Sequence, residues 1–349
     1  MTTKTDPGRF FEDFRLDETI VHATPRTLGT GDAALYQALY GSRFALQSSD
    51  EFARMLGHPR SPLDDLLVFH TVFGKSVPDI SLNAVANLGY AEGRFLRPIY
   101  PGDTLHACSR VVGLKENSNR ETGVVYVRTR GMDQHENEVL SYVRWVMVRK
   151  RDPNAATAPA HVPELSRAVS PAALTPPPAF KGRFDRLMSG SRAMFEDYEP
   201  GETIDHADGM TVEESEHMMA TRLYQNTARV HFNQFAESRG RFGKRLIYGG
   251  HVISIARALS FNGLANAVSI AAINAGRHVN PLFAGDTVFA WSQVLDKAPL
   301  RDDIGALRLR LVATGNLPCA GFPDKDEAGK YPDNVILDFD YWALMPRRA

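Results

Sequence analysis

The sequence predicts an α+β fold made of two tandem repeats, each with one central helix surrounded by antiparallel strands. The first observation is that Glu18–Ala23 is echoed by Glu202–Ala207, at an offset of 184 residues. The second is that Gly93–Leu105 is echoed by Gly276–Val288, at an offset of 183 residues. Because two separate matches share almost one offset, they indicate a duplication, and each unit has the ordinary size of a domain.

The predicted domain organisation places the first repeat at residues 1–150 and the second at residues 193–349. Residues 151–192 form a linker that is rich in proline and alanine. Its stiffest part is Thr175-Pro176-Pro177-Pro178, since proline fixes φ and removes a hydrogen-bond donor. A linker of this length can either tether the two repeats or wrap over them.

Each repeat is expected to begin with a short strand and an amphipathic helix, followed by a longer apolar helix and several alternating strands. In the first repeat we expect these elements at 19–23, 32–40, 65–76, 80–95, 103–114, 123–130 and 138–150. In the second we expect them at 203–207, 212–223, 250–259, 267–279, 286–296, 306–313 and 334–345, with an exposed loop at 315–333. Joining the two sheets edge to edge removes an exposed edge from each and leaves clefts where the repeats meet.

Composition excludes several classes of function. The net charge of −1 gives no reason to expect nucleic acid or an anionic membrane as a partner. The two cysteines, Cys108 and Cys319, show neither metal-ligand spacing nor a disulfide framework. No apolar run approaches the roughly 18 residues of a membrane span, and the N-terminus lacks the apolar core of a signal peptide. We therefore expect a soluble, cytoplasmic protein that holds no metal.

The stretch Gln225–Asn233 carries the clearest chemical signal. It places Asn226, Arg229 and His231 close together in an otherwise apolar run, and imidazole titrates near neutral pH. The corresponding positions of the first repeat hold Ser42 and Gln47, so the histidine is missing there. The asymmetry assigns the chemistry to the second repeat and predicts that the first is catalytically silent.

The duplication, the Gly-Asp-Thr turns at 102–104 and 285–287 and the Asn-x4-His tract resemble the MaoC-like hydratases of the double hot-dog fold. More narrowly, the tandem organisation and the variant Ala228-Arg229-Val230-His231 resemble the mesaconyl-CoA (2-methylfumaryl-CoA) hydratases. The resemblance implies reversible addition of water to mesaconyl-CoA, giving β-methylmalyl-CoA. It implies no cofactor, because coenzyme A is part of the acyl-CoA substrate. His231 matches the family histidine, whereas Asn226 stands where the family has an aspartate.

Hydration of an unsaturated thioester requires a base for water and donors for the thioester oxygen. We expect His231 to move the proton and Asn226 to orient the water, since an amide donates and accepts hydrogen bonds but does not titrate. Gly249 and Gly250 are expected to open the central helix of the second repeat and to offer free N–H groups to the thioester oxygen. His251 is a weaker candidate for the same cleft, and a packed helix residue is the favoured interpretation.

Binding of the rest of the substrate is assigned to basic residues. Arg229 is the candidate for the free carboxylate of the acyl group, with a solvated surface arginine as the alternative. Arg241 and Lys244 belong to a basic loop that can meet the coenzyme A phosphates, with a solvated loop as the alternative. Three other functions stay open: a hydratase of neutral enoyl-CoA chains, a thioesterase and a non-catalytic acyl-CoA binder. A homodimer is expected from base rates alone.

Overall fold

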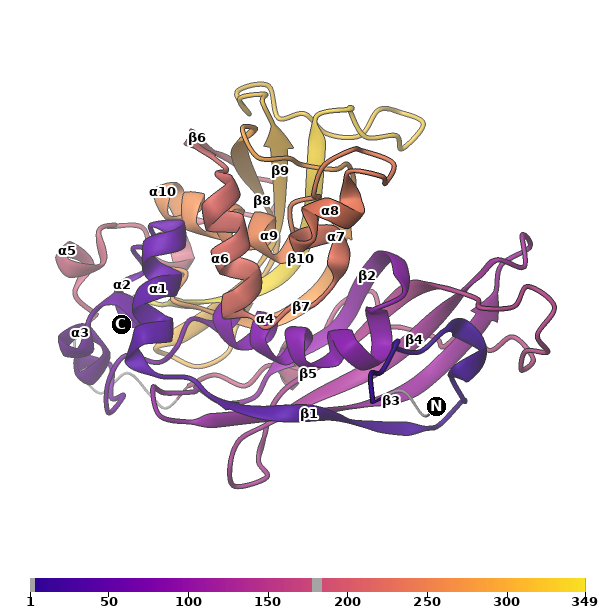
Figure 1. Cartoon of the computed structure of the whole chain (residues 1–349). Helices are drawn as coiled ribbons and strands as arrows, with labels where there is room; N and C mark the ends of the chain where they lie inside the picture. Colours follow the sequence, from indigo (N-terminus) through magenta and orange to yellow (C-terminus); the bar gives the residue numbers. More distant parts are fainter. Residues whose placement is uncertain (1–3, 178–183, 349) are drawn as a thin grey trace.

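The computed structural model describes residues 4–177 and 184–348, and within them all ten strands form a single antiparallel sheet. The strand order is β1-β3-β4-β5-β2-β7-β10-β9-β8-β6, so each repeat contributes five consecutive strands. Figure 1 shows the larger helices gathered on one side of this sheet, with the strands curving around them. The predicted α+β class and its double hot-dog arrangement are confirmed.

The first repeat has the expected elements and a few short ones that were not predicted. Its helices are α1 (Thr30–Tyr40), α2 (Ala45–Ser48), α3 (Asp50–Met55) and α4 (Asp65–Ser76), the last continued by the π-helical turn η2 (Val77–Ser81). Its strands are β1 (Thr19–Thr27), β2 (Ala84–Phe95), β3 (Thr104–Glu116), β4 (Thr122–Met132) and β5 (Glu138–Arg149). The helices α2 and α3 have only four and six residues, too few for a hydrophobic period to be recognised.

The second repeat follows the same order. Its helices are α6 (Glu214–Leu223), α7 (Arg229–Phe232), α8 (Gln234–Glu237), α9 (Gly249–Leu259) and α10 (Phe261–Leu264). Its strands are β6 (Thr203–Thr211), β7 (Ser269–His278), β8 (Thr287–Pro299), β9 (Ile304–Gly315) and β10 (Val335–Pro346). The first strand of each repeat is longer than expected, because pairing resumes after an irregularity in register between His22 and Arg26 and between Asp205 and Gly209.

The two repeats meet where β2 pairs with β7. Tyr90 lies opposite Gly276 and Arg94 lies opposite Ala272, so the two sheets join edge to edge as expected. Gly276 is required here, since a Cβ at this position would come within 2.6 Å of the Tyr90 ring. Side chains from α4 and α9 belong to one continuous core, and every residue of α4 after Asp65 is buried. An apolar helix of this kind is stable only when it is enclosed on all sides.

The described part of the linker lies against both repeats. His161 pairs with Leu114 of β3, and the indole N–H of Trp342 in β10 donates to the carbonyl of Val169 at 3.0 Å. The described part of the linker therefore wraps over the sheet and is not merely a tether between the two repeats. Pro178, the last residue of the stiff Thr-Pro-Pro-Pro run, lies outside the described residues.

Candidate active site

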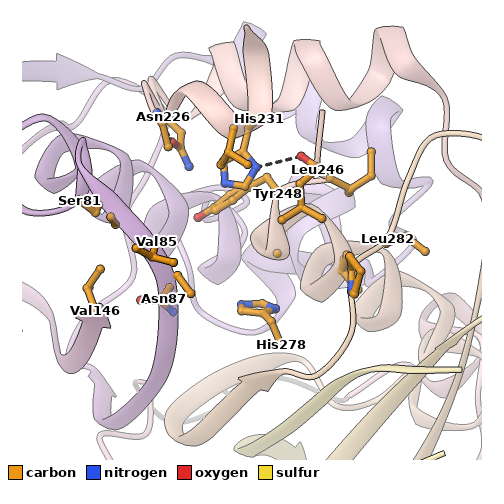
Figure 2. A pocket seen from close by; sticks show the side chains of 18 of the residues that line it. Ser81, Val85, Asn87, Val146, Asn226, His231, Leu246, Tyr248, His278 and Leu282 are labelled. Atoms are coloured by element: carbon orange, nitrogen blue, oxygen red, sulfur yellow. Dashed lines mark hydrogen bonds between the residues drawn. The ribbon is translucent and has the colours of Figure 1, made fainter. Parts of the chain in front are cut away.

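A cavity of about 320 Å³ lies at the junction of the repeats, and both repeats line it (Figure 2). This volume is at the lower end of the range typical of small-molecule sites. From the first repeat it is lined by Phe73, Val77, Ser81, Asn87, Tyr90 and Arg144, among others. From the second it is lined by Asn226, His231, Tyr248, Gly249, His278 and Leu282, among others. None of the described residues that line it is an aspartate or a glutamate.

His231 is held by a backbone contact that leaves one ring nitrogen for the cavity. Its Nδ1 lies 2.9 Å from the carbonyl oxygen of Leu246, and the N–H of Leu246 donates in turn to Val230 at 3.0 Å. Because a carbonyl can only accept, Nδ1 carries the proton and Nε2 is left as an acceptor. Burial lowers the pKa of His231 to about 4, although the hydrogen bond to Leu246 opposes this shift. At neutral pH the ring is therefore uncharged and can take a proton.

Asn226 is buried at the cavity wall, in the turn between α6 and α7. Its Oδ1 accepts a hydrogen bond from the N–H of Ala228 at 3.0 Å, which fixes the orientation of the amide. The side-chain NH₂ group is then the part that can donate to a water or to the substrate. Its Oδ1 has a second lone pair, so Asn226 keeps the capacity to donate one hydrogen bond and to accept another, as expected for a residue that orients water.

The start of α9 presents backbone donors at the cavity. Gly249 and Gly250 are the first two residues of the helix, and neither N–H has a hydrogen-bond partner in the described part of the chain. Gly249 lines the cavity, and a Cβ on it would come within 2.2 Å of the His278 ring. Gly250 lies behind it, against Tyr248 and His70. The helix end combines free N–H groups with the positive end of the helix dipole, as an oxyanion site requires.

The equivalent place in the first repeat is built from different residues. Asp65 occupies the position that corresponds to Gly249, and its Oδ2 accepts a hydrogen bond from the N–H of Ile270 at 2.7 Å. Gln47, which corresponds to His231, is buried and donates to the carbonyl of Val268 at 2.9 Å. Burial raises the pKa of Asp65 to about 8, so a mostly uncharged carboxyl group stands at neutral pH where the second repeat has a glycine, and the amide of Gln47 provides no base. Both observations are consistent with a silent first repeat.

Several cavity residues were missed by the sequence reasoning. His278 of β7 lies at the junction, where its Nε2 is 3.2 Å from the hydroxyl of Tyr90 in β2. Burial lowers its pKa to about 4. The ring of Tyr248 packs 5.3 Å from that of His231, measured between centroids. The sequence does contain a signal for His278. The corresponding residue of the first repeat is Phe95, so this histidine, like His231, occurs only in the second repeat.

Arg229 and His251 are not among the residues that line the cavity. Arg229 begins α7 but is exposed, and it is not among the residues that line the cavity. His251 is buried outside the cavity lining, and its Nδ1 lies 3.0 Å from the hydroxyl of Tyr40. A helical turn spaces consecutive side chains about 100° apart, so neighbours of a cavity residue need not face the cavity.

The basic loop lies beside the cavity and not inside it. Arg241 and Lys244 are exposed and lie over the rings of Phe242 and Phe283, at 5.1 and 4.2 Å respectively. Phe242 itself lines the cavity, so the two charges stand close to its wall. The described residues contain no cluster of three or more His, Cys, Asp or Glu side chains that could hold a metal ion. They also contain no helix long and apolar enough to cross a membrane.

Comparison with known proteins yields matches over most or all of the chain. The sequence profile of the mesaconyl-CoA hydratase family matches residues 1–316. The β-methylmalyl-CoA dehydratase of Chloroflexus aurantiacus is 62% identical, with all of both chains covered. The mesaconyl-CoA hydratase of Cereibacter sphaeroides is also 62% identical, over 99% of this chain and all of that one.

Two solved structures share the architecture. A MaoC domain protein dehydratase from Chloroflexus aurantiacus, 61% identical, superposes with a TM-score of 0.97 over the full length of both chains. A Mycobacterium tuberculosis protein with a double hotdog fold is 25% identical and has a TM-score of 0.77, over 97% of this chain and 99% of that one.

Proposed function

The chain belongs to the mesaconyl-CoA hydratase family, and we propose that it reversibly adds water to the double bond of mesaconyl-CoA to give β-methylmalyl-CoA. The observation that carries this proposal is the pairing of a neutral His231 with the free N–H groups of the α9 N-terminus at one cavity. A base and an oxyanion site are the two components that hydration of an enoyl thioester needs.

The reaction follows from this geometry. Nε2 of His231 takes a proton from water while the water oxygen forms a bond to the β-carbon of the substrate. The π electrons move onto the thioester oxygen, where the N–H groups of Gly249 and Gly250 stabilise the negative charge. The side-chain NH₂ of Asn226 donates to the attacking water and holds it in place. The imidazolium then returns its proton to the α-carbon, which completes the addition and regenerates neutral His231.

The alternatives are separated by the composition of the cavity and by one assay. A thioesterase normally needs a carboxylate base, and no aspartate or glutamate lines the described cavity. Loss of the enoyl absorbance without release of thiol supports hydration, whereas release of thiol supports hydrolysis. Binding of the thioester without either change supports a non-catalytic binder.

Replacing His231 tests the assignment of the base. We expect His231→Ala to lower kcat for mesaconyl-CoA by about 10²–10⁴-fold, the usual contribution of a general base. His135→Ala is a matched control, because His135 is exposed in the first repeat. Both variants should unfold at temperatures close to that of the wild type. A His231→Ala enzyme with near-normal kcat contradicts the mechanism.

A further inference from the structure

We propose that Arg144 of the first repeat, assisted by Asn87, binds the free carboxylate of the acyl group. This inference rests on the proposed function and gives the catalytically silent repeat a part in choosing the substrate. It also replaces Arg229, whose exposed position leaves the acyl carboxylate without a partner in the cavity.

Arg144 is a buried cation that faces the cavity without a counter-ion. It lies on β5 with 0% of its surface exposed, and it lines the cavity. Its guanidinium donates to the hydroxyls of Ser76 at 2.8 Å and Ser81 at 3.4 Å, and it lies 4.2 Å from the centre of the Phe73 ring. Its Nε is buried and has no hydrogen-bond partner, and among the described residues the guanidinium donates only to serine hydroxyls, with no carboxylate beside it. Burial lowers the pKa of Arg144, as expected for a cation removed from water.

The second repeat offers a direct comparison. Its buried arginine, Arg257, donates to Ser260 and to the carbonyl of Ala267 and lies 3.6 Å from the ring of Phe44. Burial raises the pKa of Asp64, and the charge of Arg257 opposes that shift, so this arginine has an acidic neighbour. Arg144 has hydroxyl and aromatic contacts of the same kind but no acid. An anion is therefore missing from its surroundings, and a ligand carboxylate supplies one.

Asn87 provides a second, independent feature on the same side of the cavity. Both polar atoms of its side-chain amide are buried and have no hydrogen-bond partner. Asn87 lies on β2, the strand that pairs directly with β5, and it lines the cavity together with Ser81. Figure 2 shows Ser81, Asn87 and Val146 of the first repeat on the opposite side of the view from Leu246 and Leu282 of the second. Buried amides without partners are costly, so the arrangement fits a ligand that completes their hydrogen bonds.

Arg144 and His231 line the same cavity, as the chemistry of the substrate requires. In mesaconyl-CoA the carboxylate is attached to the carbon that water attacks, so its binding group must lie close to the base. A continuous set of ring contacts joins the two: His231 to Tyr248 at 5.3 Å, Tyr248 to Phe73 at 5.9 Å, and Phe73 to Arg144 at 4.2 Å. Since no acidic side chain lines the described cavity, Arg144 gives it a positive potential that favours an anionic acyl group.

The test uses two saturated thioesters that bind but do not react. Methylsuccinyl-CoA and 2-methylbutyryl-CoA differ only by a carboxylate in place of a methyl group. Calorimetric Kd values should show that the wild type prefers methylsuccinyl-CoA by about 100-fold, the order expected for a buried charge pair. Arg144→Gln should reduce that ratio to about threefold or less, and Arg144→Lys should restore part of it, since lysine keeps the charge but not the fork of donors. Arg229→Ala is the matched control and should keep the wild-type ratio.

The proposal is overturned if a folded Arg144→Gln enzyme keeps the wild-type ratio of the two Kd values. It is also overturned if Arg229→Ala loses that ratio, or if the wild type shows no preference for methylsuccinyl-CoA. If Arg144→Gln does not fold, Asn87→Ala decides: a ratio reduced by about fivefold supports the site, and an unchanged ratio contradicts it. Hydration of mesaconyl-CoA by the wild type is measured separately. A wild type that binds methylsuccinyl-CoA selectively but hydrates nothing refutes the proposed function and leaves the carboxylate site intact.

Discussion

Substitution of Gly249 by alanine tests whether the α9 N-terminus must approach the substrate closely. The added Cβ would lie 2.2 Å from Cε1 of His278 and 2.5 Å from both ring nitrogens. Ordinary contact begins at 3.4 Å, so the ring must move by more than 1 Å or the helix start must shift by a similar amount. Either movement alters the cavity wall that carries the proposed oxyanion donors and disturbs the contact between His278 and Tyr90.

The expected cost follows from these distances. Overpacking of this kind destabilises a fold by about 1–3 kcal/mol, and a displacement of roughly 1 Å in an active site lowers turnover by about 10²-fold. We therefore expect Gly249→Ala to lower kcat/KM for mesaconyl-CoA by about two orders of magnitude, with a fall of only a few degrees in Tm. Loss of enoyl absorbance gives the first quantity and thermal unfolding gives the second.

A matched control exists in the first repeat. Gly31 lies in the first turn of α1 and is exposed, and a Cβ there would have no heavy atom within 4 Å. Gly31→Ala should leave kcat/KM unchanged and leave Tm equal or slightly raised. If Gly249→Ala keeps both the wild-type kcat/KM and the wild-type Tm, the close approach at the helix start has been misjudged.

Two further predictions concern pH and packing. Because the pKa of His231 is lowered to about 4, the imidazole is neutral and can act as a base above that pH. We therefore expect kcat/KM to be level from about pH 5 to 8 and to fall only as the pH drops towards 4. A half-maximum near 6.5 in the pH profile would instead indicate an ordinary, solvated histidine. A Cβ on Gly74 of α4 would lie 1.8 Å from the carbonyl oxygen of Tyr224, so Gly74→Ala should lower the free energy of unfolding by about 3 kcal/mol or more. Denaturant titration measures this loss, and a change below about 0.5 kcal/mol, the range of neutral surface substitutions, contradicts the close packing.

Much of the fold could be predicted because local pattern and repetition agree. The expected segments 65–76 and 138–150 correspond almost residue for residue to α4 and β5, since each has a strong period and clear ends. The short helices α7 and α8 could not be predicted, because four residues carry no period and their stability comes from tertiary contacts. The edge-to-edge junction was expected, but its register depends on distant pairing that no local pattern contains.

The predicted residues that line the cavity all come from the second repeat, where comparison of the two repeats drew attention to His231. His231, Asn226 and Gly249 line the cavity, and all three belong to the second repeat. Arg144 was missed because a charged residue in a strand is usually taken to face solvent. Its alternation with Tyr142 and Val146, two buried residues two positions away, places it on the apolar face of β5 and is a signal that the sequence did contain. The sequence favoured a packed His251 and left the position of Arg229 open, since the orientation of a short helix depends on the fold around it.

The junction of β2 with β7 has a consequence for how such a site can change over generations. In a dimer of identical single-repeat chains, every substitution appears twice, once on each side of the symmetry axis, and a change that improves one wall of a site alters its symmetry mate as well. Fusion of the repeats into one chain removes that constraint. Position 65 can hold an aspartate while position 249 keeps a glycine. In the same way, position 47 can hold a glutamine while position 231 keeps a histidine. The single continuous sheet thus gives each wall of the cavity its own independently inherited set of residues.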